Sequence, residues 1–131
     1  MPEVVAGLLW VALGGALGGP ARYFVSGLVG RRFGETFPWG TLAANVSGCL
    51  LIGALAATLS FDGMNLSSPG WQIAGIGFLG SYTTVSSFSR ETLALVQNGQ
   101  PGGAGRNVVL SVGLCFAAVA LGYFAAAGAF A

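Results

Sequence analysis

The chain has 131 residues, of which 54% are hydrophobic and 7% are charged, and its net charge is +1. A soluble domain usually carries about 25% charged residues, so this composition fits a small membrane protein and little else. The low net charge argues against a nucleic-acid partner, and the absence of histidine removes the commonest general base and metal ligand.

Four segments are long and apolar enough to cross a membrane, which takes roughly 20 residues per helix. They cover residues 4–29, 39–60, 71–96 and 105–127, and short connections rich in turn residues join them at 34–38, 62–70 and 98–103. Trp39 and Trp71 stand at predicted span starts, where interfacial aromatic residues belong. The sequence therefore predicts an all-α membrane protein with one transmembrane domain, residues 1–131, whose function lies within the membrane.

The first predicted span carries the run Gly14–Gly19, in which small residues four positions apart let two helices approach closely. Arg22 follows one turn beyond Gly18, on the same face of the helix. Arg22 is either an interfacial arginine that extends to the lipid surface or a charge that attracts anions to a vestibule.

Polar and small side chains recur every four residues in two of the other spans. They are Thr41, Asn45 and Cys49 in the second span, and Asn107, Ser111 and Cys115 in the fourth. A carboxamide within the membrane is costly unless it is hydrogen-bonded, so Asn45 either joins two helices or offers its N–H donors to an anion in a pathway. Two such stripes predict a narrow polar track, and donors without a fixed positive charge suit a small anion that must not be held too tightly.

The two cysteines, Cys49 and Cys115, both lie in the middle of apolar segments. A disulfide framework is not expected from them, and a thiolate metal site would need more ligands. We interpret both as small residues that pack well.

The third predicted span contains the most informative stretch of the chain, the small and hydroxylated run from Gly77 to Glu91. Gly80 is a poor helix residue, and the bulky or β-branched residues that follow it are stiff. The run therefore predicts a helix break around Gly80–Thr84. Broken membrane helices are where ion sites tend to lie, which indicates an ion pathway.

With these residues in view, the chain resembles the Fluc (CrcB) fluoride channel family over essentially its whole length. The resemblance rests on three blocks in the right order, at residues 14–23, 38–48 and 77–91. It implies an antiparallel dimer of four-helix subunits, a third helix that is broken, and two fluoride pathways along the subunit interface. It also implies passive export of fluoride across the bacterial plasma membrane, and a structural, non-transported Na⁺ held by the backbone carbonyls of Gly80 and Thr83 from each subunit.

The resemblance also assigns roles to side chains of this sequence. The implied fluoride-pathway residues are Asn45, Phe88, Val85, Thr84, Ser111, Thr41, Asn107 and Cys115, and the implied vestibule residues are Arg22 and Glu91. The family usually has phenylalanine where this chain has Val85. A phenyl edge carries positive quadrupole and can face an anion, whereas an isopropyl group cannot. Cys115 is a milder departure, since a thiol is a weaker donor than the hydroxyl usual there.

Other classes of function remain open from the residues alone. A proton-coupled small multidrug exporter is also a four-helix membrane protein, but it needs an intramembrane carboxylate, for which Glu91 is a poor substitute. A packing or assembly subunit without a pore would explain the small-residue motif but does not need a broken helix. A membrane enzyme is the least expected, because no acid–base constellation is visible.

The arginines predict an orientation. All five, Arg22, Arg31, Arg32, Arg90 and Arg106, fall at or near the first and third connections. The positive-inside rule places those connections in the cytoplasm and both termini outside. A chain that inserts in both directions would show little bias, so the partner in the dimer is either a second copy or a homologous subunit of opposite bias.

Overall fold

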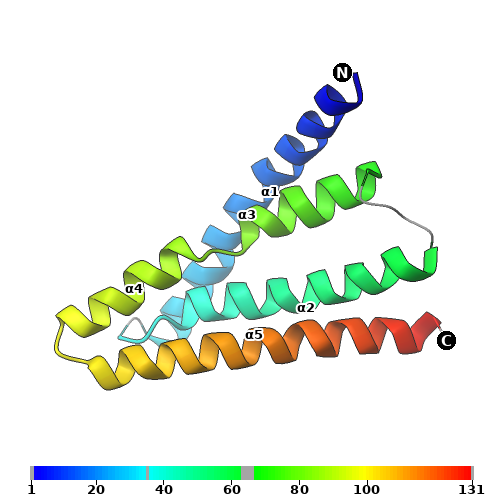
Figure 1. Cartoon of the computed structure of the whole chain (residues 1–131). Coiled ribbons are helices and arrows are strands. Elements are labelled where there is room, and N and C mark those ends of the chain that lie inside the picture. Colours follow the sequence, from blue (N-terminus) through cyan, green and yellow to red (C-terminus); the bar gives the residue numbers. More distant parts are fainter. Residues whose placement is uncertain (1, 35, 63–66, 131) are drawn as a thin grey trace.

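The computed structural model describes residues 2–34, 36–62 and 67–130, and Figure 1 shows their arrangement. The regular elements in these ranges are all helical. They are α1 (Pro2–Phe33), α2 (Trp39–Asp62), a π-helical segment η1 (Trp71–Leu79), α3 (Gly80–Tyr82), α4 (Ser86–Gln97) and α5 (Pro101–Phe130).

Three of these helices are long and apolar enough to cross a membrane: Pro2–Phe33, Trp39–Leu59 and Pro101–Ala129. The predicted first and second spans agree with α1 and α2 to within a few residues. The predicted fourth span, residues 105–127, lies within α5, which begins at Pro101. Proline suits the first position of a helix, where its fixed φ is already helical and its missing N–H is not needed. Residues 63–66 of the predicted second connection, and Glu35 of the first, lie outside the described residues.

The helices alternate in direction (Figure 1). The two chain termini lie toward one end of the bundle, together with the end of α2 and the start of η1. The connections from α1 to α2 and from α4 to α5 lie toward the opposite end. This arrangement puts the arginine-rich connections on one side, which is the side that the sequence assigns to the cytoplasm.

Close helix packing follows from glycines on α1. Gly14 and Gly18 are buried, and α1 packs along η1 and α3. A Cβ atom at Gly14 would meet the carbonyl of Ile73, and one at Gly18 would meet the carbonyl of Phe78. Ser81 Oγ donates a hydrogen bond to Gly15 O at 3.2 Å across the same contact. The predicted role of the small-residue run in tight packing is therefore confirmed.

Glycines also bring α2 and α5 together. A Cβ at Gly53 would meet the carbonyl of Val119, and a Cβ at Gly122 would meet the carbonyl of Leu50. The two helices pack along much of their length, as Figure 1 shows. They form one wall of the bundle, and η1, α3 and α4 face it.

The helix break lies at the carboxyl-terminal end of the predicted range, Gly80–Thr84, and extends one residue beyond it. Gly80 has helical dihedrals, φ −62° and ψ −35°, and its N–H lies within hydrogen-bonding reach of the carbonyls of Gly75 and Gly77. The chain leaves helical geometry at Thr83, whose ψ is 161°, and enters α4 at Ser86. A glycine costs only about 1 kcal/mol in a helix interior, which surrounding contacts readily offset. The non-helical residues are therefore 83–85, and Gly80 is not the residue that breaks the helix.

Candidate functional site

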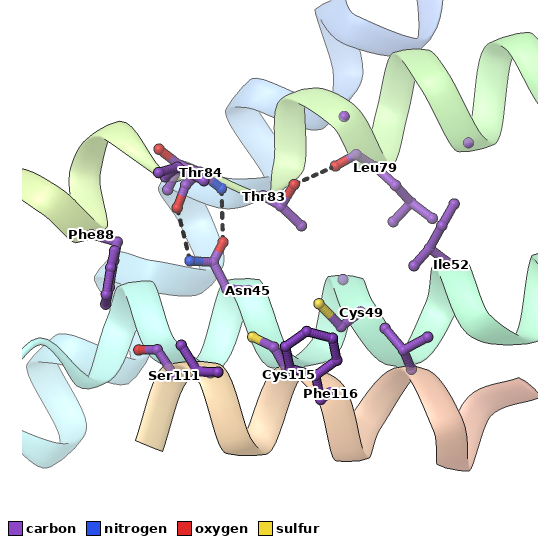
Figure 2. A pocket seen from close by; sticks show the side chains of 16 residues that line it. Asn45, Cys49, Ile52, Leu79, Thr83, Thr84, Phe88, Ser111, Cys115 and Phe116 are labelled. Carbon is purple, nitrogen blue, oxygen red and sulfur yellow. Dashed lines mark hydrogen bonds between the residues drawn. The ribbon is translucent and has the colours of Figure 1, made fainter. Parts of the chain in front are cut away.

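Asn45 lies on the facing helix α2, and its side chain is hydrogen-bonded to the non-helical segment. Its Nδ2 donates to Thr84 O at 2.8 Å, and its Oδ1 accepts from Thr84 N at 2.7 Å. One carboxamide thus pairs both backbone groups of one residue, as a strand neighbour would, and Figure 2 shows the two bonds side by side. Helix geometry at Thr84 would require that its N–H point to Gly80 O instead. The Asn45 side chain has one further N–H, which this pairing does not use.

The Thr84 side chain starts the next helix. Its Oγ1 accepts from Ser87 N at 3.1 Å and lies 3.1 Å from Ser86 Oγ. Thr84 stands just before Val85, the residue that precedes α4, and its hydroxyl accepts from an N–H of the first turn; a hydroxyl in such a capping role typically stabilises a helix by about 1 kcal/mol. Thr84 is buried, so its backbone bonds to Asn45 and its hydroxyl bonds replace water within the bundle.

Arg22 reaches the same segment from α1. Its Nη1 donates to Thr83 O at 3.2 Å. In a continuous helix the donor to Thr83 O would be Ser87 N, but that N–H is bonded to Thr84 Oγ1. The guanidinium therefore replaces a backbone donor. The sequence left Arg22 either at the lipid surface or in a vestibule, and the structure places it on the backbone of the helix break.

A pocket of about 660 Å³ lies between the third-span segments and the wall formed by α2 and α5. Figure 2 shows how its side chains converge from these elements. Most of the residues assigned by the resemblance line this pocket: Asn45, Gly80, Thr83, Thr84, Val85, Phe88, Ser111 and Cys115. Phe116 and Cys49 line it too. Among the residues that the structure describes, its lining contains no arginine, lysine, aspartate or glutamate, so its polar groups there are amide, hydroxyl, thiol and backbone groups.

Only part of the polar stripe predicted in the fourth span, Asn107, Ser111 and Cys115, lines the pocket. Ser111 and Cys115 line it, whereas Asn107 is only 2% exposed and faces α4. Asn107 Nδ2 donates to Thr92 Oγ1 at 2.9 Å, and Thr92 Oγ1 donates to Phe88 O at 2.7 Å. Asn107 thus supports the backbone of the helix that carries Phe88. Ser111 Oγ lies 3.4 Å from Asn107 Oδ1, to which it donates.

Thr41 and Glu91 lie together in a second pocket of about 490 Å³, toward the arginine-rich end. Thr41 Oγ1 donates to Glu91 Oε1 at 2.7 Å. Arg31 lines this second pocket as well. The contact joins α2 to α4 near the end of the bundle, so this carboxylate lies apart from the residues of the first pocket.

Three contributors were missed by sequence reasoning. Thr92 connects Asn107 to the Phe88 backbone, Phe116 fills part of the pocket wall, and Tyr82 lies 2.9 Å from Ser47 through its hydroxyl. Thr92 and Ser47 could have been flagged as hydroxyls in apolar spans. Phe116 carries no signal that separates it from other lipid-facing aromatic residues.

These features define a class of protein: a multi-pass helical membrane protein whose polar groups gather at a helix break inside the bundle. Residues 9–123 match the family described as CrcB-like protein, Camphor Resistance (CrcB). The chain belongs to this family.

Individual relatives carry a more specific name. The chain is 53% identical over 126 residues to the fluoride-specific ion channel FluC 2 of Bradyrhizobium diazoefficiens, with 95% of this chain and 92% of that protein covered. It is 53% identical over 127 residues to the protein of the same name from Rhodopseudomonas palustris, with coverage of 96% and 97%. It is 50% identical over 121 residues to the fluoride-specific ion channel FluC of Opitutus terrae, with coverage of 92% of each chain. The resemblance drawn from the sequence is confirmed, and the family is one of ion channels, not of enzymes.

Proposed function

We propose that this chain forms a fluoride-selective channel that lets fluoride leave the cytoplasm down its gradient across the bacterial plasma membrane. The observation that carries the proposal is the first pocket, where Asn45, Ser111 and Phe88 meet at the helix break. The names of the relatives support the same ion.

The chemistry of the pocket suits fluoride. A small, strongly hydrated anion enters a low-dielectric interior only if protein donors replace its water. The second N–H of Asn45 and the edge of Phe88 are such donors, and the Ser111 hydroxyl becomes one when it turns away from Asn107 Oδ1, to which it donates at 3.4 Å. The described residues of the pocket lining carry no fixed positive charge, so an anion held by these donors can also leave.

The dimer is part of the proposal. Val85 is 77% exposed and Phe116 is 74% exposed, although both line the first pocket. A second, antiparallel subunit placed against this pocket would cover these apolar side chains and enclose the pathway on its open side. The proposed interface therefore contains the fluoride pathway.

A structural Na⁺ at the centre of this dimer is also proposed. The carbonyl of Gly80 loses its helical donor, because Thr84 N is bonded to Asn45, and both Gly80 and Thr83 line the pocket. Backbone carbonyls suit a hard cation, and the helical donor that would compete for Gly80 O, Thr84 N, is bonded to Asn45 instead. Thr83 O keeps one lone pair besides the one that Arg22 uses. The chemistry of the donor set therefore fits the ion.

The partner is either a second copy or a homologous subunit. The arginine bias of the connections and the valine at position 85 favour a homologous partner of opposite bias, which could supply the missing phenyl group. The number in the name FluC 2 is consistent with more than one such chain in those organisms. In that case this chain alone would not conduct.

The multidrug-exporter alternative finds little support. Glu91 accepts a hydrogen bond from Thr41 toward the end of the bundle, outside the pocket that holds the helix break. An exporter of cationic drugs needs its carboxylate in the substrate site.

One experiment tests the function: fluoride efflux from liposomes that contain only this chain, with chloride efflux measured in parallel. A homodimeric fluoride channel releases fluoride and retains chloride. Equal rates for the two anions would refute selectivity. Fluoride efflux together with labelling of carboxyl-terminal tags from both membrane sides would refute the requirement for a homologous partner.

A further inference from the structure

Two backbone carbonyls at the helix break, those of Gly80 and Thr83, differ in their hydrogen-bond partners. Gly80 O and Thr83 O have both lost their helical donors, because Thr84 N is bonded to Asn45 Oδ1 and Ser87 N to Thr84 Oγ1. Arg22 Nη1 donates to Thr83 O at 3.2 Å, whereas Gly80 faces the pocket. One of the two proposed cation ligands therefore already carries a cationic partner from its own chain.

The position of Arg22 is fixed by packing of the backbone. Gly18, one turn earlier on α1, touches Phe78 and Ser81 so closely that a Cβ would collide with both. This contact fixes α1 against α3 and brings the guanidinium to a residue 61 positions away in the sequence. Arg22 is half-buried, and no carboxylate of the described residues is paired with it. Since arginine stays protonated in proteins, the charge at the break is permanent.

We infer that Arg22 sets the affinity of the proposed Na⁺ site by opposing the ion at the Thr83 carbonyl. The inference rests on the Na⁺ site of the proposed function and assigns its regulation to a residue of this chain. The oxygen has lone pairs for both partners, so Arg22 and the ion bind together, but their like charges repel. The same guanidinium holds the break in shape when the ion is absent, which makes the fold less dependent on Na⁺.

The direction in which removal of Arg22 changes the Na⁺ affinity distinguishes an opposing charge from an arginine that only shapes the break. At an effective dielectric of about 20, two like charges roughly 5 Å apart shift an equilibrium by about two orders of magnitude. Removing the charge should therefore tighten Na⁺ binding, and we expect a change of at least about tenfold. An arginine that only shapes the break would, on removal, weaken Na⁺ binding.

The test is calorimetric Na⁺ titration of the detergent-solubilised protein, equilibrated in a salt of a large organic cation, for the wild type, Arg22→Gln and Arg22→Lys. Arg22→Gln should bind Na⁺ more tightly, and Arg22→Lys, which keeps the charge, should stay within roughly threefold of the wild type. Arg106→Gln is the matched control, because Arg106 lies over the Phe37 ring at 4.9 Å, away from the break, and its loss should leave the affinity unchanged. Arg22→Met makes the same comparison if the glutamine variant does not assemble.

The outcomes distinguish the two proposals. If the wild type, shown to be dimeric in the detergent, and all variants fail to bind Na⁺, the Na⁺ site itself is refuted. If the wild type binds Na⁺ and neither Arg22→Gln nor Arg22→Met binds it more tightly, the opposing role of Arg22 is refuted while the site remains. Equal tightening in Arg106→Gln would show an effect of overall charge and would likewise overturn the assignment to Arg22.

Discussion

Replacing Asn45 with alanine tests whether one side chain holds the helix break. The change removes the hydrogen bonds of 2.8 Å and 2.7 Å to Thr84 and leaves the N–H and the C=O of that residue without their partners. Thr84 is only 8% exposed, so water does not readily replace the amide. An unsatisfied buried backbone group costs about 1–3 kcal/mol, so the loss is about 2–6 kcal/mol in each subunit.

The freed Thr84 N–H has an alternative acceptor within the chain, the carbonyl of Gly80, one helical turn earlier. Asn45→Ala should therefore favour an extended α3 and a closed break. A free-energy difference of about 1.4 kcal/mol changes an equilibrium constant tenfold. The loss of about 2–6 kcal/mol therefore shifts the equilibrium between the open and the closed helix break by at least about 30-fold. Fluoride efflux from liposomes should fall by a similar factor or more, because the pathway also loses a donor.

Hydrogen–deuterium exchange distinguishes the two causes of a lower fluoride efflux, which are closure of the helix break and loss of a donor from the pathway. Loss of the bonds to Thr84 should change exchange in the peptide covering residues 80–88, whereas loss of a pathway donor alone should not. Asn107→Ala is the comparison, since Asn107 is also a buried carboxamide but is bonded to Thr92, whose hydroxyl donates to Phe88 O, so its loss should change exchange within α4 and not at Thr84. Wild-type efflux and unchanged exchange in Asn45→Ala would refute this account of Asn45.

Further predictions concern the cap, the aromatic contacts and the helix contact. Thr84→Val should lower the thermal stability by about 1 kcal/mol and increase exchange in the first turn of α4, because Ser87 N loses its acceptor; unchanged exchange would contradict the capping role. Val85→Phe should raise fluoride flux or leave it unchanged and Phe88→Ile should lower it, measured as efflux rates; unchanged flux in both would exclude the rings from the pathway. Gly18→Leu should impair folding or markedly lower the melting temperature, since even a Cβ there meets the Phe78 carbonyl; a wild-type melting temperature would show that α1 does not pack as described.

Much of the fold could be predicted from the sequence, because membrane helices are marked by long apolar runs and their contacts by small residues. Gly14 and Gly18 indicated a close helix contact that the structure contains. The four-residue spacing of two polar stripes predicted a narrow track, and four of their six members, Asn45, Cys49, Ser111 and Cys115, line one pocket. Such patterns depend on local spacing, which the sequence displays directly.

The site could be predicted less well, since its shape depends on long-range pairing. Local propensity points to Gly80 as the weak residue, but the break falls where Asn45 captures Thr84, 39 positions away. Asn107 shares its four-residue spacing with Ser111, yet it is turned toward Thr92 and away from the pocket. Neither the hydrogen-bond partner of Asn45 nor that of Asn107 can be predicted from the sequence of a single helix.

Three groups of this chain shape the break: Asn45 on α2, Arg22 on α1 and Thr84 within the segment. A single subunit can therefore fold this segment during insertion, before it meets any other subunit in the bilayer. In the proposed channel, dimer formation would then join two subunits that are already folded, and little conformational entropy would be lost in that step. In that proposed assembly, a subunit would be able to exchange partners without unfolding its own site, so one chain would have access to both identical and homologous partners in the same membrane.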